Sequence, residues 1–337
     1  MKRNVKYTTL FMLTLCLLLR VSVSQGSDAK KTNLMELNVA ILPYLSYSPL
    51  FIALDEGFFE EQGLRIKISK FARSPEVVPA LAQGSLDAAG SFMSVSLLNA
   101  IARGANIKIV ACKSYIDPKG CTYTGLLAKR SLVESGELKN PIQLKGRRIV
   151  INEASIEGYW VEKLLKRAGL HLNDVKHGDL PPPTVFAAFE KGSIDLASES
   201  EPWITRSIKA NHAVMWMSME NVVPDFQYAF LMFGPNLLKK NSEAGNRFMI
   251  AYLKALKQLS HGKTFRNLEI MSKHTKLDTK LLLEACWPSF HKDGRINTQS
   301  FLEFQSWAVE KGYMEQAAAI EKVWDSSFVE HANQVLK

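Results

Sequence analysis

The chain has 337 residues, of which 47% are hydrophobic and 22% charged, so it is long enough to form two domains with substantial cores. Its formal net charge is +9, but four cations and no acidic residue lie in residues 1–24, which leaves about +5 for the rest. The remaining Lys and Arg residues are scattered and form no long basic run, so the charge gives no support to nucleic-acid binding.

Residues 1–24 have the pattern of a secretory signal peptide. Basic, apolar and small residues follow one another, at Lys2, Arg3 and Lys6, at residues 7–19 and at residues 22–24. The apolar run is too short to span a bilayer, and cleavage is expected near Gln25. A lipid anchor would use Cys16, but Leu15 occupies a position that requires a small residue. We therefore expect export to the periplasm.

One segment of the chain occurs twice. Residues 75–89 and 183–197 match at seven of fifteen positions at a constant offset of 108, and both contain a Gly-Ser-x-Asp turn. Because a repeat at this spacing is too long for a solenoid, it indicates two similar lobes with a cleft between them. Asp87 and Asp195 recur at the same turn, so we expect them to serve loop geometry and not a ligand.

The elements expected before and after this repeat alternate between strand and helix. Strands are predicted at residues 35–42, 64–71, 86–89, 107–112 and 148–152, and helices at residues 50–55, from about 75, 94–103 and 158–168. Ser48 is the predicted N-cap of the first helix, ahead of Pro49. This order is typical of mostly parallel sheets flanked by helices.

The chain after about residue 240 lacks strand patterning. Amphipathic runs at residues 248–260, 279–285 and 300–311 predict a helical C-terminal cap on one lobe. Residues 115–125 and 222–234 are the predicted hinges between the lobes, since both contain Pro or Gly among polar residues.

Three cysteines follow the signal peptide. A turn at residues 117–120 could bring Cys112 and Cys121 together in a disulfide, and two reduced cysteines near strand ends are an equal alternative. Cys286, beside Trp287, is expected in the core. No Cys or His cluster has metal-ligand spacing, so neither a metal nor a cofactor is expected.

Three motifs resemble the sulfonate, nitrate and taurine substrate-binding proteins, a family that includes binders of thiamine-pyrimidine precursors. They are the runs at residues 48–64 and 144–151 and the Glu-Pro-Trp at residues 201–203. The resemblance implies an α/β, type II periplasmic binding protein fold with two doubly wound lobes joined by two crossover segments. We expect residues 35–122 and 228–337 in the first lobe and 123–227 in the second. The resemblance also implies a monomer that delivers a small solute to an ABC permease.

Ligands in open α/β sheets lie outside the carboxyl ends of the strands, which points to loops of the first lobe. Tyr44, Tyr47 and Ser48 follow the first strand and precede a helix N-terminus, although the tyrosines could simply pack on neighbouring prolines. Ser91 and Phe92 follow the first repeat, where Ser94 could cap the next helix.

The second lobe offers equivalent loops. Ala154, Ser155 and Glu157 follow a strand, with capping as the alternative role of Ser155. Tyr159 and Trp160 are adjacent on a helix, so at most one faces the cleft.

The second repeat is followed by acidic and aromatic residues. Glu199, Glu201 and Trp203 follow its strand, and Gln227 and Tyr228 lie in the second crossover. Two acids favour a cationic or amidine-like group, while a local ion pair between Glu201 and Arg206 is an equal alternative.

Aromatic residues in this set favour a small organic solute with a heteroaromatic, pyrimidine-like ring. The alternatives are a binder of sulfonate, taurine or nitrate-type anions, and a ligand-sensing partner of a membrane receptor. A pyrimidine-synthesis-like enzyme is disfavoured, because no catalytic arrangement accompanies the export signal.

Overall fold

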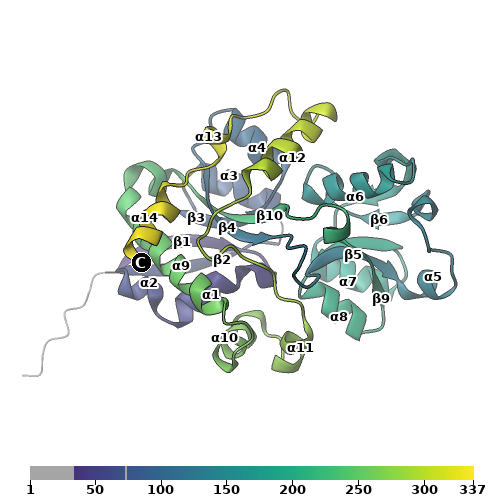
Figure 1. Cartoon of the computed structure of the whole chain (residues 1–337), viewed down its shortest axis with the longest axis horizontal. Helices are drawn as coiled ribbons and strands as arrows, with labels where there is room; N and C mark the ends of the chain where they lie inside the picture. Colours follow the sequence, from purple (N-terminus) through teal and green to yellow (C-terminus); the bar gives the residue numbers. More distant parts are fainter. Residues whose placement is uncertain (1–33, 73) are drawn as a thin grey trace, which may run out of the picture. The chain divides into compact units, whose positions relative to one another are not determined.

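The computed structural model describes residues 34–72 and 74–337 (Figure 1), so the predicted signal peptide lies outside the described residues. Two five-stranded sheets form its framework, in the orders β2-β1-β3-β10-β4 and β7-β6-β8-β5-β9. The strands are β1 Met35–Ile41, β2 Leu64–Lys70, β3 Ala88–Phe92, β4 Lys108–Tyr115, β5 Thr124–Lys129, β6 Arg148–Val150, β7 Lys176–Gly178, β8 Leu196–Ser200, β9 Ala213–Ser218 and β10 Gln227–Phe233.

The two sheets have the same internal plan. In the first, β1 pairs in parallel with β2 and β3, and β10 lies antiparallel between β3 and β4. In the second, β6 pairs in parallel with β7 and β8, and β5 lies antiparallel between β8 and β9. The sequence-based expectation of two α/β lobes is confirmed. Each sheet also contains one antiparallel strand, β10 or β5, which begins where the chain has just passed from the other lobe.

Helices cover both sheets. Those of the two lobes are α1 Ser48–Asp55, α2 Phe58–Glu61, α3 Val77–Ala82, α4 Val95–Ala102, α5 Arg130–Glu134, α6 Ile156–Lys166, α7 Pro182–Glu190 and α8 Trp203–Lys209. The C-terminal helices are α9 Ser242–Leu259, α10 Phe265–Thr275, α11 Thr279–Glu284, α12 Thr298–Glu310, α13 Ile320–Val323 and α14 Ser327–Val335. A π-helical turn at Asn236–Lys240 precedes α9.

The repeated Gly-Ser-x-Asp turn has the same structure in both lobes. Gly84 and Gly192 have φ of +76° and +66°, a conformation that glycine adopts without steric cost. Asp87 accepts a hydrogen bond from the backbone N–H of Asn38 at 2.6 Å, and Asp195 accepts one from that of Arg148 at 2.8 Å. Each carboxylate thereby ties its turn to the neighbouring parallel strand, which confirms that the two aspartates are structural.

The second crossing is shorter than the sequence predicted. The segment 222–234 was expected to be a hinge, but β10 occupies most of it, and every residue of β10 is buried in the middle of the first sheet. The chain crosses at residues 116–123 and 219–226, between β4 and β5 and between β9 and β10. The apolar run of β10 is the reason for the difference, because a strand buried on both faces lacks the alternation that marks a half-buried strand.

The C-terminal helices contact both lobes and not one alone. Helices α9, α10 and α14 pack in the first lobe, where α9 contacts α1 and α14 (Figure 1). Helix α11 contacts α8, and α12 contacts α6 of the second lobe. The buried carboxylate of Glu162 in α6 accepts hydrogen bonds from Trp307 Nε1 at 2.7 Å and Lys311 Nζ at 2.9 Å. The helical segment therefore links the two sheets outside the crossings.

The disulfide joins Cys121 to Cys286, with Cα atoms 5.7 Å apart, and Cys112 is free and buried in β4. The pairing of Cys112 with Cys121 considered from the sequence is therefore wrong, whereas Cys286 is partly buried and packs against the core as expected. The short sequence spacing favoured Cys112 as the partner of Cys121. In the fold, however, the chain that follows α11 returns to the segment between β4 and β5, which places Cys286 beside Cys121. Cys112 instead has its thiol beside Gln227 Nε2 at 3.5 Å.

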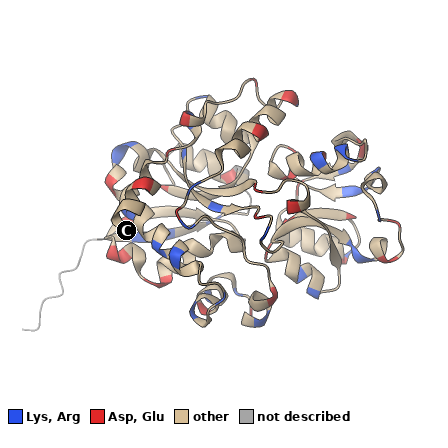
Figure 2. Cartoon of the chain, in the orientation of Figure 1, with Lys and Arg blue, Asp and Glu red and all other residues tan. Residues whose placement is uncertain are grey.

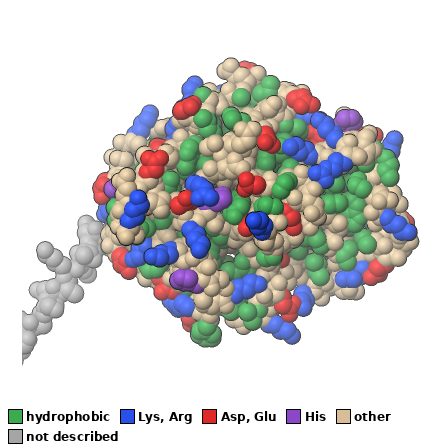
Figure 3. Space-filling model, in the orientation of Figure 1, with side chains coloured by type: hydrophobic (Ala, Val, Ile, Leu, Met, Phe, Trp, Pro, Cys, Tyr) green, Lys and Arg blue, Asp and Glu red, His purple; other side chains and the backbone are tan. Residues whose placement is uncertain are grey.

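Charges of both signs are interspersed over the elements of both lobes (Figure 2) and over the face seen in Figure 3. Among residues 34–72 and 74–337, no helix is sufficiently long and apolar to cross a bilayer.

Candidate functional site

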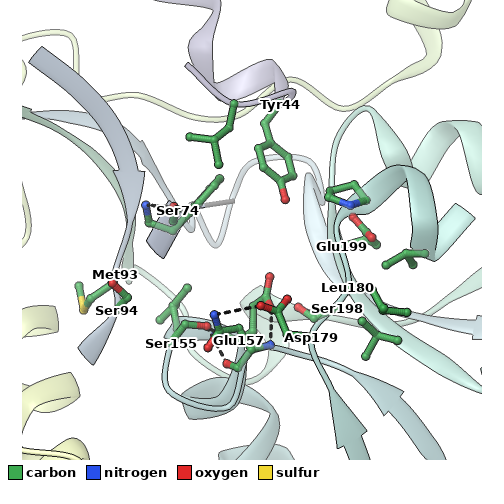
Figure 4. Close-up of a pocket in the computed structure, with 17 residues that line it drawn as sticks. Tyr44, Ser74, Met93, Ser94, Ser155, Glu157, Asp179, Leu180, Ser198 and Glu199 are labelled. Atoms are coloured by element: carbon green, nitrogen blue, oxygen red, sulfur yellow. Dashed lines mark hydrogen bonds between the residues drawn. The ribbon is translucent and has the colours of Figure 1, made fainter. Parts of the chain in front are cut away.

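A pocket lies where loops of the two lobes meet, and we call it the central pocket (Figure 4). It is formed at the carboxyl ends of β1, β3, β6, β7 and β8, the position at which open α/β sheets bind ligands. Its polar lining consists of Tyr44, Ser74, Ser94, Asn152, Ser155, Glu157, Asp179, Ser198 and Glu199, and its apolar lining includes Leu42, Phe92, Met93 and Leu180.

Two helix N-termini meet at the floor of the central pocket. Ser94 caps α4 and Ser155 caps α6, each accepting a hydrogen bond from a first-turn backbone N–H. The two cap segments also pair with each other across the lobes, because Val95 N donates to Ala154 O and Ile156 N donates to Met93 O, both at 2.9 Å. Backbone donors that could otherwise hold an anion are thus used to join the lobes.

Glu157 is held in place from the backbone. Its Oε2 accepts a hydrogen bond from Asn152 N at 2.8 Å, across the loop that Ser155 caps. Burial, with the nearby charge of Asp179 adding to it, raises the pKa of Glu157 to about 7. The carboxyl group therefore changes charge near neutral pH.

Glu199 and Tyr44 face the same space from opposite lobes (Figure 4). Burial and the charge of Glu157 raise the pKa of Glu199 well above its ordinary value, opposed by a hydrogen bond from the backbone of Ser200. Burial and the charges of Glu199 and Glu157 raise the pKa of Tyr44, so its hydroxyl remains a donor. Two acids of raised pKa and a phenol thus converge on one cavity.

Among the described residues that line the central pocket, none is Lys, Arg or His, whereas three are acidic. A ligand anion would meet Glu157, Asp179 and Glu199 in a poorly solvated space, which is unfavourable. A cation or a group rich in N–H donors would instead satisfy carboxylate oxygens through charge-assisted hydrogen bonds. The rings of Phe92 and Tyr44, with centroids 5.0 Å apart, supply an aromatic wall for a flat ligand.

The structure brings five of the residues predicted from the sequence together in the central pocket. They are Tyr44, Phe92, Ser155, Glu157 and Glu199. Ser155 also has its alternative role, because it caps α6.

Other predicted residues of the first lobe lie beneath the pocket. Tyr47 is fully buried and donates to Gly90 O at 2.8 Å. A Cβ at Gly90 would lie 2.5 Å from the Tyr47 ring, so only glycine permits this approach. Ser91 donates to Ser74, which does line the pocket. Ser48 is the first residue of α1 and not its N-cap, and its buried hydroxyl has no hydrogen-bond partner among the described residues.

Three further predicted residues lie outside the pocket. Ala154 contributes its carbonyl to the pairing of the cap segments. Tyr159 packs on Trp307 and donates to Glu303, so neither it nor Trp160, which donates to Ser198, faces the cavity.

Gln227 and Tyr228 also lie outside the central pocket, within and beside the first sheet. Gln227 is buried, and its amide donates to backbone carbonyls of Ser114 and Ala229. The Tyr228 hydroxyl lies 3.3 Å from Thr124 Oγ1 and 3.0 Å from Ser200 Oγ. It links β10 to the second sheet behind the Phe92 ring.

Glu201 and Trp203 hold the lobes together at one side of the central pocket. Glu201 accepts from Thr205 and from Cys286 N, so the alternative of an ion pair with Arg206 is wrong. Its backbone carbonyl accepts from Leu45 N at 3.0 Å. Trp203 Nε1 donates to Pro43 O, also at 3.0 Å.

Several residues were not found by sequence reasoning. Asn152, Asp179 and Ser198 line the pocket, and Lys113 lies buried below it. Asp179 directly follows β7, so the carboxyl-end rule would have found it had that short strand been bounded correctly. Lys113 donates to Ser46 Oγ at 2.6 Å, and burial lowers its pKa well below the ordinary value. No sequence pattern distinguishes this lysine from an exposed one.

A two-lobed α/β fold is also that of solved periplasmic solute-binding proteins. The profile of the NMT1-like family matches residues 30–272, and the chain belongs to that family. A protein of Brucella abortus assigned only as a binding protein is 28% identical over 240 residues, or 71% of this chain and 70% of the relative. The taurine-binding periplasmic protein of Escherichia coli is 27% identical over 48% of this chain and 47% of its own length.

Solved structures share the fold at lower identity. The alkanesulfonate-binding protein SsuA of Xanthomonas axonopodis, bound to MOPS, superposes with a TM-score of 0.68 at 19% identity, over 86% of this chain and 98% of its own. The nitrate-binding protein NrtA of Synechocystis gives 0.73 at 14% identity, over 90% and 89%. The desulfurization enzyme DszB gives 0.64 at 12% identity, over 90% and 100%, so the fold alone does not separate binding from catalysis.

Proposed function

We propose that this protein is the periplasmic solute-binding component of an ABC importer and that its solute is a small, flat, nitrogen-rich molecule. An aminopyrimidine or similar heteroaromatic base, cationic or rich in N–H donors, fits best. The chain would act as a monomer that delivers this solute to the permease. Family membership and the names of the relatives support the transport role, and the lining of the central pocket supports the solute class.

The observation that carries the solute class is the convergence of Glu157, Glu199 and the Tyr44 hydroxyl beside an aromatic wall. A protonated ring nitrogen with an adjacent amino group can donate two parallel hydrogen bonds to one carboxylate. The aromatic ring of such a solute would stack or pack edge-on against Phe92. A nitrate or a simple sulfonate carries acceptors only and would donate no hydrogen bond to Glu157 or Glu199.

Closure of the lobes supplies the signal for delivery. The solute touches Tyr44 of the first lobe and Glu157 and Glu199 of the second, so its binding energy favours the arrangement in which both are near. The hydrogen bonds from Trp203 to Pro43 and from Leu45 to Glu201 form in that same arrangement.

A thermal-shift screen of the mature protein tests the proposal. The panel contains aminopyrimidines, flavin precursors, alkanesulfonates, taurine, aromatic acids and nitrate at pH 7.5, and native mass spectrometry identifies any co-purified solute. Saturation at about 100 times the dissociation constant adds about 2.7 kcal/mol of stability, which corresponds to a shift of several degrees. We expect that shift from a heteroaromatic base.

The Glu199→Gln variant provides the control, because it keeps the size of the side chain and cannot form the carboxylate that a cationic solute would stabilise. It should reduce the shift that the base produces to about half or less, because the base binds ten- to hundredfold more weakly. A larger shift from nitrate or an alkanesulfonate than from any base, retained in the variant, would contradict the proposed solute class and favour an anion binder. Turnover of a pyrimidine by the protein would contradict a pure binding role.

A further inference from the structure

A second pocket lies on the other side of Leu42 and Tyr44, and we call it the flanking pocket. Its volume is about 250 Å³, close to the lower end of the range of small-molecule sites. We propose that the flanking pocket binds a small apolar anion, namely a carboxylate or sulfonate carried on an aromatic or hydrocarbon body. This proposal does not depend on which solute occupies the central pocket.

The walls of the flanking pocket suit an apolar body. Phe51, Phe71, Trp203 and Leu277 line it together with Ile41 at the end of β1. These side chains come from α1, from the end of β2, from α8 and from the segment after α10. An aromatic ring or short alkyl chain placed among them would lose most of its contact with water, which is the main source of affinity for such a ligand.

The rim of the flanking pocket is cationic. Lys70, Arg206 and Lys276 line it, and none of the three makes an ion pair or a side-chain hydrogen bond with any described residue. The guanidinium of Arg206 lies over the Trp203 ring, 4.7 Å from its centroid, so its N–H donors remain available at the ring's edge. Asp55, which contacts the pocket-lining His274, is already paired with Lys273 and His274.

His274 contributes in a different way. Its ring lines the pocket and stacks on Phe51 with centroids 4.6 Å apart, while its Nε2 faces Asp55 at 2.7 Å. Its Nε2 is therefore already engaged by Asp55, and the ring acts chiefly as part of the wall. Three cations that form no ion pair with a described residue surround an apolar space, and an apolar anion would complete this arrangement.

The flanking pocket also joins the lobes. Trp203 and Arg206 belong to the second lobe, whereas Lys70, Phe51 and Lys276 come from the first-lobe side. An anion bound here would contact both lobes and stabilise the same closed arrangement that Trp203 supports through its hydrogen bond to Pro43.

Titration with 4-(trifluoromethyl)benzenesulfonate, followed by calorimetry and by the ¹⁹F signal of the ligand, tests this inference. We expect one equivalent to bind to the wild-type protein. The triple variant Lys70→Gln, Arg206→Gln, Lys276→Asn should bind at least about tenfold more weakly, because each charge favours the anion. Asn is chosen at position 276 because φ is +59° there and Asn tolerates that conformation.

A matched variant separates the pocket from net charge. Arg65→Gln, Lys67→Gln, Lys280→Gln removes the same number of charges from exposed sites outside the flanking pocket and should bind like wild type. The single variant Lys70→Gln, at an exposed position, keeps the test valid should the triple variant fail to fold; we expect it to bind about threefold more weakly.

Two further titrations complete the test. The double variant Glu157→Gln, Glu199→Gln changes only the central pocket and should bind the sulfonate as wild type does. The cationic analogue 4-(trifluoromethyl)benzylamine should not compete with the sulfonate. Equal affinity in the two triple variants, loss of sulfonate binding in the central-pocket variant, or no binding at millimolar concentration would each overturn the proposal.

Discussion

The central and flanking pockets share Leu42 and Tyr44 but have opposite charge. The central pocket takes Glu157, Asp179 and Glu199 from the carboxyl ends of second-lobe strands. The flanking pocket takes its cations from the end of β2, from α8 and from the residue that ends α10. The difference shows that one loop, residues 42–44, can present one face to an acidic site and the other to a basic site. The character of each pocket depends on what the opposite wall contributes.

The disulfide lies in the region that holds the two lobes together beside both pockets. Its removal should have the largest effect on the free energy of unfolding. Cys121 and Cys286 join points 165 residues apart, and the Cys286 N–H donates to Glu201, beside Trp203. The double variant Cys121→Ser, Cys286→Ser should lose about 2–5 kcal/mol of unfolding free energy. Urea denaturation measures this loss, and wild type under reducing conditions serves as the control. An unchanged urea midpoint would show that the C-terminal helical segment stays packed on the two lobes without the disulfide.

Replacing Glu199 by Gln should weaken ligand binding in the central pocket and leave binding in the flanking pocket unchanged. A hydrogen bond to a buried charged group contributes about 1.5–3 kcal/mol, so Glu199→Gln should weaken binding of a heteroaromatic base by roughly ten- to hundredfold. Calorimetry with the base found in the screen measures the change. Affinity of the flanking pocket for the arylsulfonate should stay constant, and a parallel loss there would show that the pockets are one site.

The raised pKa of Glu157 predicts how pH affects the protein without solute. Because the folded-state pKa is about 7 and the unfolded value near 4.5, the folded state binds more protons between these values, and stability falls as pH rises through this range. Glu157→Gln should remove this fall and raise the unfolding free energy at pH 8 by about 3 kcal/mol, with little change at pH 4. Denaturation curves at the two pH values measure it; an equal effect at both would refute the charge argument.

Tyr44→Phe should change ligand affinity least, and it tests whether the Tyr44 hydroxyl serves only the central pocket. The variant loses the hydroxyl that faces Glu157 and Glu199 but keeps the ring that lines both spaces. We expect solute affinity in the central pocket to fall by about three- to tenfold, as for a single neutral hydrogen bond. Arylsulfonate affinity in the flanking pocket should not change. Calorimetry with both ligands distinguishes loss of the Tyr44 hydroxyl donor, which affects only the central pocket, from loss of ring packing, which would affect both.

Much of the fold was predictable because its signals are local. The repeated Gly-Ser-x-Asp turn identified two lobes, and its structure explains why the pattern is readable, since each residue has a fixed local role. Helices with clear caps, such as α4 after Ser94, were also found within a residue or two. The strand β10 was missed because its fully buried sequence lacks alternation, and β9 was not predicted at all.

The candidate site was predictable in part. The rule that ligands lie at carboxyl ends of strands placed Tyr44, Phe92 and Glu199 at one cavity. It could not tell which side chain of a loop turns inward, so Tyr47 and Trp203 were grouped with them although one is buried beneath the pocket and the other joins the lobes beside it.

The sequence by itself determined the class of fold, because hydrophobic period, helix caps and a repeated turn all act over a few residues. Only the tertiary structure decided the pairing of Cys121 with Cys286, the burial of Lys113, and the division of the cleft into an acidic and a basic pocket. These features depend on contacts between segments far apart in the sequence, 67 residues for Lys113 and Ser46 and 165 for the two cysteines. Chain spacing carries no information about such distances, which are set by how two sheets and their helices pack.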